Sequence, residues 1–352
     1  MAGRPFLPDL VPCREDSGVQ LEQVGGARVD LLQWQSQASN EQVALPVYTD
    51  RWLSSNTCGS IEQVVVHVHG KERDADIAWA DIAAARGRLS VDQQKKTLLV
   101  VPQFLNGLDK SKYQPANQDL LLVWKGNGWG EGSPSVRPKA SVSNDNTGIS
   151  SFEALDAILS HFANRQMYHG VERIVFSGHS MGGQLVHRYS ILSSPILPAA
   201  KRDLKVEYVV MNAASYLYFS GEREGPPAPN MNEYKYGFDN IATHIPIYPG
   251  IQTQQDPHWY LSRMLQERQI HFVNGATDRG TGDDRPEAMA QGADRRERAV
   301  NYHRHLKRME ASIGKTGERL WTVDWVPGVK HDGAAMTSSN AAIARIFARI
   351  VA

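Results

Sequence analysis

The stretch 171–183 reads Val-Glu-Arg-Ile-Val-Phe-Ser-Gly-His-Ser-Met-Gly-Gly and decides the fold of this chain. Its largely apolar first half predicts a short buried strand, and the residues that follow the stretch predict a helix. The G-x-S-x-G pattern between them is typical of a sharp strand-to-helix turn that strains the backbone of the central serine and exposes its hydroxyl. Gly178 and Gly182 leave room for such a turn because they carry no side chains. The stretch therefore predicts an α/β fold with Ser180 as a candidate nucleophile.

A candidate base follows the last predicted strand, in the segment Val-Pro-Gly-Val-Lys-His-Asp-Gly at 326–333. A serine hydroxyl is a poor nucleophile and needs a neighbouring base to accept its proton. We predict that His331 is this base, because it lies in a glycine-flanked loop at a strand end; a surface histidine is the alternative interpretation. His179 and His187 are weaker candidates because they share the turn and the helix of the nucleophile.

The candidate acid that would orient this histidine is Asp278, which closes the strand predicted before it. The three candidates follow one another along the chain in the order serine, acid, histidine, and each lies at the end of a predicted strand. A Ser-His-Asp triad requires both features in this kind of fold. Asp283 and Asp284 lie in the same loop and are rivals for the role. The strand one step earlier ends at Asn212 without a carboxylate, which favours Asp278.

Two backbone amides are candidates for stabilising a negative oxygen beside Ser180. Met181 follows the serine directly, and Lys71 follows an early predicted strand. His67 and His69 share one face of that strand, but no third ligand lies at a spacing suited to a metal site. We therefore predict no metal and no cofactor, and we expect His69 to bond to backbone beneath the site.

The rest of the chain alternates strands with helices, which predicts a mostly parallel central sheet with helices on both faces. A helix with a serine cap is expected at 150–162, and the glycine-rich stretch 119–146 is expected to be a rim loop. We predict one α/β domain over 1–352. The predicted strands are 29–34, 44–48, 63–70, 97–102, 173–176, 206–211, 270–275 and 320–326.

The segment 214–268 lies between the sixth and seventh predicted core strands and is rich in aromatic and polar residues. So long a connection is uncommon without a purpose, and we predict a cap or lid over the strand ends. Its tyrosines combine an apolar ring with a polar tip, which suits substrate contact as well as packing. The predicted substrate-binding residues are Tyr216, Tyr234 and Tyr236. Cations that could bind a substrate carboxylate, or lie solvated at the surface, are Arg73, Arg223 and Lys235.

Composition excludes several other functions. The chain has 352 residues, of which 41% are hydrophobic. Its 38 Lys and Arg balance its 38 Asp and Glu, so it lacks the net positive charge that would favour nucleic-acid binding. No stretch approaches the roughly 20 apolar residues that a membrane-spanning helix needs. The first residues lack the apolar core of a secretion signal, so we expect a cytoplasmic protein, or a secreted one if a signal has been removed. We also expect Cys13 and Cys58 to be reduced, with one disulfide as the alternative.

The serine turn, the loop at 69–71 and the late Asp278 and His331 together resemble the α/β-hydrolase superfamily, from about residue 61 to the end. Finer features are similar to a branch of mostly uncharacterised microbial serine hydrolases, many of them fungal. Relatives often carry a proline where this chain has Ala213, and commonly a secretion signal that is not seen here. The motifs that carry the resemblance are 69–75 (His-Gly-Lys-Glu-Arg-Asp-Ala), 151–153 (Ser-Phe-Glu), 184–189, 212–216 (Asn-Ala-Ala-Ser-Tyr), 234–237 (Tyr-Lys-Tyr-Gly) and 291–295 (Gln-Gly-Ala-Asp-Arg).

The resemblance implies a Ser-His-Asp mechanism but names no substrate. We expect a serine hydrolase that cleaves a carboxylic ester, small or oligomeric, lactones and polyester-like chains included, through an acyl-enzyme. One alternative is an amidase or peptidase with the same triad. Another is a non-hydrolytic enzyme of the same fold, such as a lyase, a cyclase or an enzyme that cleaves carbon–carbon bonds. The oligomeric state is left open.

Overall fold

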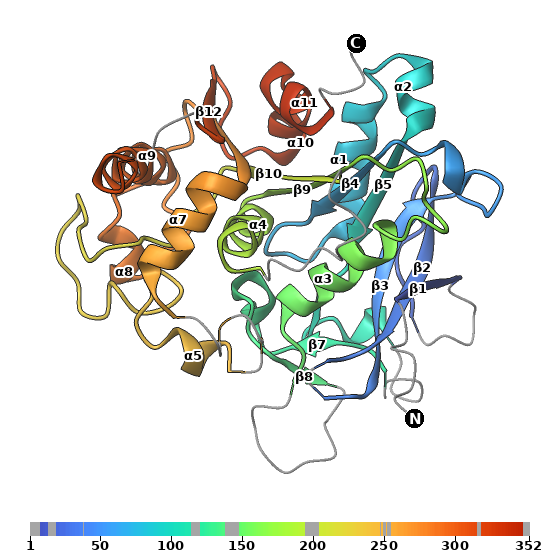
Figure 1. Ribbon diagram of the computed structural model, residues 1–352, viewed down its shortest axis with the longest axis horizontal. Coiled ribbons are helices and arrows are strands. Elements are labelled where there is room, and N and C mark those ends of the chain that lie inside the picture. Colours follow the sequence, from blue (N-terminus) through green and yellow to red (C-terminus); the bar gives the residue numbers. More distant parts are fainter. Residues whose placement is uncertain are drawn as a thin grey trace.

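A nine-stranded sheet forms the centre of the protein, in the order β1-β2-β3-β5-β4-β9-β10-β11-β12. Figure 1 shows it crossing the molecule from β12 to β1. Neighbouring strands from β5 to β12 pair in parallel, while β1, β2 and β3 extend the sheet with antiparallel pairs. The computed structural model describes residues 8–12, 19–37, 39–113, 120–137, 148–193, 204–246, 248, 251, 255–314 and 318–347.

The sheet strands agree with the predicted ones, with one addition. The short edge strand β1 was not predicted, so the segment 214–268 follows the seventh sheet strand in chain order rather than the sixth. The strands are β1 (Asp9–Pro12), β2 (Ala27–Gln35), β3 (Gln42–Asp50), β4 (Gln63–Val68), β5 (Thr97–Pro102), β9 (Arg173–His179), β10 (Lys205–Met211), β11 (Gln269–Gly275) and β12 (Trp321–Val326).

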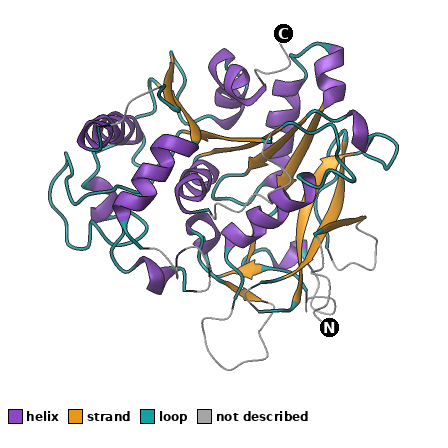
Figure 2. Ribbon diagram, in the orientation of Figure 1, coloured by secondary structure: helices purple, strands orange, loops and turns teal. Residues whose placement is uncertain are grey.

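Helices cover both faces of the sheet, as Figure 1 and Figure 2 show. On one face lie α1, α10 and α11, and on the other lie α3, α4, α7 and α9. The fold class is therefore the predicted α/β arrangement. The longer helices are α1 (Ala75–Arg86), α3 (Ser151–Phe162), α4 (Met181–Leu192), α7 (Pro257–Glu267), α9 (Arg295–Ser312) and α11 (Asn340–Phe347); shorter ones are α2 (Val91–Lys96), α5 (Ile241–His244), α8 (Pro286–Met289) and α10 (Gly333–Thr337).

Two apolar layers follow from the sequence of the central strands. Every residue of β4 and β5 is buried, because β-branched and leucine side chains point to both faces of a covered parallel sheet. The Ser150 hydroxyl caps α3 by accepting from the amide of Phe152 at 3.1 Å, as predicted. This framework fixes the carboxyl ends of β4, β9, β11 and β12 at one edge of the sheet.

The prediction of a rim loop over 119–146 was wrong in its described part. Strands β6 (Leu105–Asn106), β7 (Val123–Trp124) and β8 (Ser135–Arg137) form a small second sheet, and a short 3-10 helix spans Gly128–Glu131. The indoles of Trp124 and Trp129 are fully buried and pack on Phe104. The serial glycines therefore allow tight turns around buried indoles, instead of forming an open rim.

The segment 214–268 joins the apolar core on the α4 face of the sheet. Tyr216 and Tyr218 are fully buried there, and Tyr216 stacks on Tyr302 of α9 with ring centroids 4.5 Å apart. The assignment of the segment as a cap, and of 1–352 as one domain, stays a prediction.

Burial of one carboxyl group in this core gives the protein a pH-dependent stability. Asp156 of α3 accepts hydrogen bonds from the hydroxyls of Tyr189 and Tyr248, each at 2.7 Å. Burial raises the pKa of Asp156 to about 7, although the two hydroxyls favour its ionised form. The folded protein then keeps a proton that the unfolded chain, with an aspartate pKa of about 3.9, releases. The contribution of Asp156 to the free energy of unfolding therefore falls as the pH rises from about 4 to about 7.

We expect Asp156→Asn to remove this dependence, because asparagine mimics the neutral acid. Between pH 5 and pH 7, the free energy of unfolding of the original protein should fall by about 2 kcal/mol relative to that of the variant. Urea unfolding of both proteins at several pH values measures this. If the two proteins differ in unfolding free energy by the same amount at every pH in that range, the raised pKa of Asp156 is wrong.

Two smaller expectations concern the thiols and the membrane. Cys58 is a free, buried cysteine whose Sγ donates to the carbonyl of Ser54 at 3.1 Å; Cys13 lies outside the described residues. Within the described ranges, no helix is long and apolar enough to cross a bilayer.

Candidate active site

Ser180 lies at the sharp turn between β9 and α4. Its backbone has φ 59° and ψ −118°, a conformation that residues with side chains rarely adopt. A Cβ atom on Gly182 would lie 2.2 Å from the carbonyl oxygen of Val68, and one on Gly178 would lie 2.5 Å from the backbone of Gly182. The predicted need for glycine at both positions is therefore confirmed. The turn leaves Ser180 partly exposed at the strand ends.

The structure brings Ser180, His331 and Asp278 together from three separate strand ends. The Ser180 Oγ lies 2.9 Å from His331 Nε2, and His331 Nδ1 lies 2.8 Å from Asp278 Oδ2. The His331 side chain is 26% exposed, whereas that of Asp278 is 2% exposed. The three groups thus form one continuous hydrogen-bonded line from a reachable hydroxyl to a buried carboxylate.

Asp278 carries a negative charge in this arrangement. Burial alone would raise its pKa, but the hydrogen bond and charge of His331, together with the charge of Arg295, lower the pKa below the ordinary value. Arg295, in the first turn of α9, places Nη1 3.3 Å from Asp278 Oδ1. A Cβ on Gly280 or Gly282 would lie about 2.5 Å from the Arg295 guanidinium, so the acid loop closes directly over this side chain.

His179 packs against the predicted base, His331, but does not take part in proton transfer. The two imidazole rings lie 4.6 Å apart between centroids. Burial, followed by the neighbouring His331, lowers the pKa of His179 to about 3, so this ring stays neutral. His187 is fully buried, with Nε2 2.9 Å from the hydroxyl of Tyr302. Neither histidine lies in the line of Ser180 and Asp278.

Asn212 joins the loops that carry the acid and the base. Its Nδ2 donates to the carbonyl of Lys330 at 3.1 Å, and its Oδ1 accepts from the amide of Gly275 at 2.7 Å. It occupies the strand end where the sequence offered no carboxylate. An amide serves here because one side chain must both donate and accept, which a carboxylate cannot do.

The loop after β4 holds the second predicted amide, that of Lys71. The Lys71 side chain is largely exposed, but the loop around it is fixed: Arg73 donates to the carbonyl of Lys71 at 2.8 Å and pairs with Asp109 at 2.6 Å. His69 bonds to backbone at both ring nitrogens, to Gly70 and Phe104, as expected. Met181 begins α4, where the first amides have no partner within the helix.

The structure contradicts the prediction that Tyr216 contacts substrate. The side chain is fully buried; its backbone exchanges hydrogen bonds with the Gln291 side chain at 2.9 and 2.8 Å. Packing against α9 therefore takes up the whole ring. Tyr234 and Tyr236 keep a small exposed area and bond through their hydroxyls to Glu131 and Asp283. Their contact with substrate stays a prediction.

The remaining candidate charges have partners inside the protein. Lys235 is buried and pairs with Glu131 at 2.9 Å. Arg223 donates to backbone carbonyls of its own segment and lies over the ring of Tyr218. Asp283, a rival for the acid, pairs with Arg285 at 2.8 Å. These charges therefore stabilise the 214–268 segment and the loop after β11.

Metal ligation finds no support in the described part of the chain, where no group of three or more His, Cys, Asp or Glu could hold an ion. His67 instead places Nδ1 2.9 Å from the Ser177 hydroxyl, and burial lowers its pKa to about 3.

Sequence reasoning missed Arg295 and Asn212 as residues that hold the site. Both lie in motifs that carry the family resemblance, 291–295 and 212–216, yet nothing in their spacing indicates which strand end each would contact. Arginine beside a carboxylate becomes visible only when α9 is docked on the loop after β11.

We expect Arg295→Met to move the acidic limb of the pH–kcat/KM profile to higher pH by about one unit. Loss of the Arg295 charge raises the pKa of Asp278, so the carboxylate that holds His331 becomes protonated, and activity is lost, at a higher pH. Steady-state kinetics from pH 4 to pH 9 on a simple ester measure the shift.

Arg279→Gln is the matched control, because Arg279 is a neighbouring cation whose side chain is 63% exposed and pairs with Asp294. Solvent screens that charge, so the profile should not move. An equal shift in both variants would show that overall charge, not the contact with Asp278, sets the profile.

Comparisons with known proteins agree with this architecture. The chain is similar to a poly(3-hydroxybutyrate) depolymerase from Bordetella parapertussis, with 20% identity over 91% of this chain and 90% of that chain and a TM-score of 0.59. It is also similar to poly(aspartic acid) hydrolase-1 from Sphingomonas sp. KT-1, with 17% identity over 90% of this chain and 97% of that chain and a TM-score of 0.55. No protein-family model matches the chain, and no curated protein matches it in sequence. The sheet order, the serine turn and these likenesses together show that the chain has the α/β-hydrolase fold.

Proposed function

We propose that this protein is a serine hydrolase that cleaves carboxylic esters through a covalent acyl-enzyme. The observation that carries the proposal is the line of two hydrogen bonds, 2.9 and 2.8 Å long, from Ser180 through His331 to Asp278. In this proposal Ser180 is the nucleophile, His331 the general base and acid, and Asp278 the group that orients the imidazole and stabilises its charge.

In the first half-reaction, Ser180 Oγ attacks the ester carbonyl carbon while its proton passes to His331 Nε2. The amides of Met181 and Lys71 donate to the carbonyl oxygen as it becomes negative. The bond to the leaving alcohol then breaks, and the alcohol oxygen takes the proton from Nε2. In the second half-reaction, water gives a proton to Nε2 and attacks the acyl carbon. The bond to Oγ breaks, and the proton returns to Ser180 as the carboxylic acid leaves.

The substrate class is an ester, small or oligomeric, with lactones and polyester-like chains included. Support comes from the fold likeness to an enzyme whose name states that it depolymerises a polyester. Tyr234 and Tyr236 supply rings with polar tips for substrate contact, in the segment 214–268 that we propose as a cap. No cofactor takes part, and a cytoplasmic location stays a prediction.

A fluorophosphonate probe tests the nucleophile, because it reacts with an activated serine and not with an ordinary one. We expect one label per chain, located by peptide mass on the peptide that contains Ser180. An unlabelled Ser180 in folded protein would contradict the proposal.

A matched pair of substrates, p-nitrophenyl butyrate and p-nitrobutyranilide, tests the bond type. The ester should be cleaved at least 100-fold faster in kcat/KM, with a burst of one nitrophenol per chain if deacylation is slow. Faster cleavage of the anilide would favour the amidase alternative. A labelled serine without hydrolysis of either compound would favour a non-hydrolytic reaction.

A further inference from the structure

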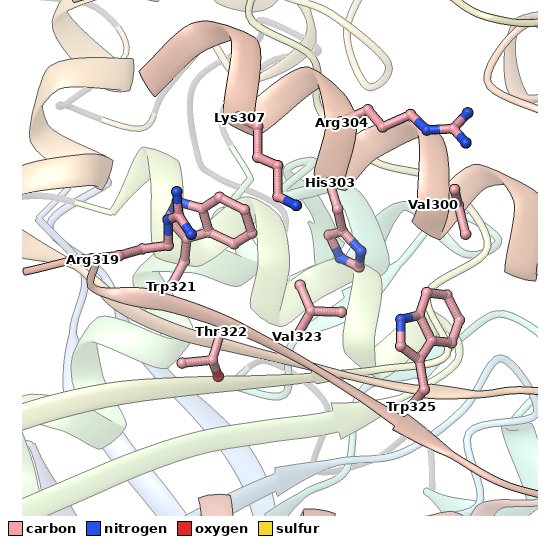
Figure 3. Close-up of a pocket in the computed structure, with 9 residues that line it drawn as sticks. All are labelled: Val300, His303, Arg304, Lys307, Arg319, Trp321, Thr322, Val323 and Trp325. Carbon is pink, nitrogen blue, oxygen red and sulfur yellow. The ribbon is translucent and has the colours of Figure 1, made fainter. Parts of the chain in front are cut away.

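A cavity of about 590 Å³ lies between α9 and the edge strand β12 (Figure 3). None of its lining residues belongs to the Ser180 site. Side chains from the helix and from the strand meet across it, as Figure 3 shows. The residues that matter are His303, Arg304 and Lys307 of α9 and Arg319, Trp321 and Trp325 of β12 and its approach.

Aromatic rings form the walls of this cavity. The ring of His303 lies nearly parallel to that of Trp321, with centroids 6.4 Å apart, and meets Trp325 edge-on at 6.2 Å. Trp325 is 36% exposed and lies on the outer strand of the sheet. An exposed indole beside two further rings suits a flat apolar group.

Positive charge surrounds these rings. Arg304 and Lys307 are exposed, and neither pairs with a carboxylate in the described part of the chain. Arg319 lies over the Trp321 ring at 4.7 Å, and its charge is balanced by Glu310 at 2.5 Å. The two unbalanced cations therefore favour an anion and disfavour a cationic ligand.

Two buried nitrogens at this cavity have no hydrogen-bond partner: His303 Nε2 and Trp321 Nε1. Their side chains are 6% and 3% exposed. An indole N–H can only donate, so its missing partner is an acceptor. Burial, with the charge of Lys307 second, lowers the pKa of His303 to about 3, so its ring is neutral and can donate through Nε2 in one tautomer.

We propose that this cavity is a binding site for a planar aromatic carboxylate. The ring would lie against Trp325, and the carboxylate would accept from Lys307, whose ammonium points toward His303 in Figure 3; Arg304 would add a second positive charge nearby. His303 Nε2 and Trp321 Nε1, which are buried without a partner, would supply further donors once the lining side chains rearrange around the bound ligand. A free inorganic anion would leave the aromatic walls without a partner, and a neutral aromatic ring would leave the two cations without one. The proposal does not depend on the function of Ser180.

Isothermal calorimetry with 2-naphthoate tests this site, with 2-naphthamide as the uncharged ligand of the same shape. We expect saturable binding of the carboxylate and at least tenfold weaker binding of the amide, which corresponds to about 1.4 kcal/mol. The protein is the full chain, and circular dichroism checks that each variant is folded.

Lys307→Gln and Trp325→Ala should each weaken 2-naphthoate at least tenfold, since both side chains are exposed and their loss leaves the fold intact. The matched controls are Lys205→Gln and Trp52→Ala, which make the same exchanges at exposed positions outside this cavity. Unchanged affinity in the controls supports the proposal. Equal affinity for the amide, equal loss in controls and cavity variants, or no binding up to about 10 mM would overturn it.

Discussion

We expect Ser180→Ala to lower kcat for ester hydrolysis by about 10⁴-fold or more while the protein remains folded. The substitution removes the only atom that attacks the substrate in the proposed mechanism. The turn itself is set by the backbone and by the glycines on both sides of it, which the exchange does not touch. Any remaining rate enhancement over the uncatalysed reaction in water would come only from substrate binding and the two backbone amides. Stopped-flow and steady-state assays on p-nitrophenyl butyrate measure the loss.

Ser177→Ala is the matched control for this result. Ser177 lies on the same strand, three residues before the nucleophile, but its hydroxyl bonds to His67. We expect this variant to lose some stability, about 1 kcal/mol for one buried hydrogen bond, and to keep kcat within a few-fold. If Ser180→Ala retained activity similar to that of Ser177→Ala, the assignment of the nucleophile would be wrong.

Asp278→Asn should lower kcat by roughly 10⁴-fold, the loss that this exchange causes in another Ser-His-Asp enzyme. The carboxylate accepts a hydrogen bond from the protonated Nδ1 of His331 at 2.8 Å. Nε2 therefore carries no hydrogen and is free to take the proton of Ser180. An asparagine amide can donate to Nδ1 instead, which places the histidine proton on Nε2. The base would then face the serine hydroxyl with a hydrogen where it needs a lone pair.

Asp284→Asn separates this effect from a general change of charge in the same loop. Asp284 is exposed and was a rival for the acid in the sequence. We expect its kinetics to match those of the original protein. A large loss in Asp284→Asn with little loss in Asp278→Asn would transfer the role to Asp284.

The sequence predicted the central sheet well because its strands are short apolar runs that must be buried on both faces. Gln63–Val68 and Thr97–Pro102 show the pattern clearly. The edge strand Asp9–Pro12 escaped prediction, since only four residues form it and its pairing with β2 depends on the rest of the sheet. Glycine-rich composition misled the interpretation of 119–146, where buried indoles decide the structure.

The positions of the candidate triad could be predicted because each residue type is required at a strand end in a known order. Substrate contacts could not be predicted in the same way. Tyr216 has the composition of a binding residue, yet its ring is buried against Tyr302, a residue 86 positions later that no local pattern connects with it. Arg295 was missed for the same reason.

The line from Ser180 to Asp278 joins residues that are far apart along the polypeptide, with separations of 151 positions between Ser180 and His331 and 53 between His331 and Asp278. Such long-range closure comes late when a chain folds, because the entropy of every intervening loop must be lost first. Recovered turnover after dilution from denaturant should therefore lag behind the return of helical signal. In refolding experiments, the return of turnover would report when β11 and β12 reach their final positions.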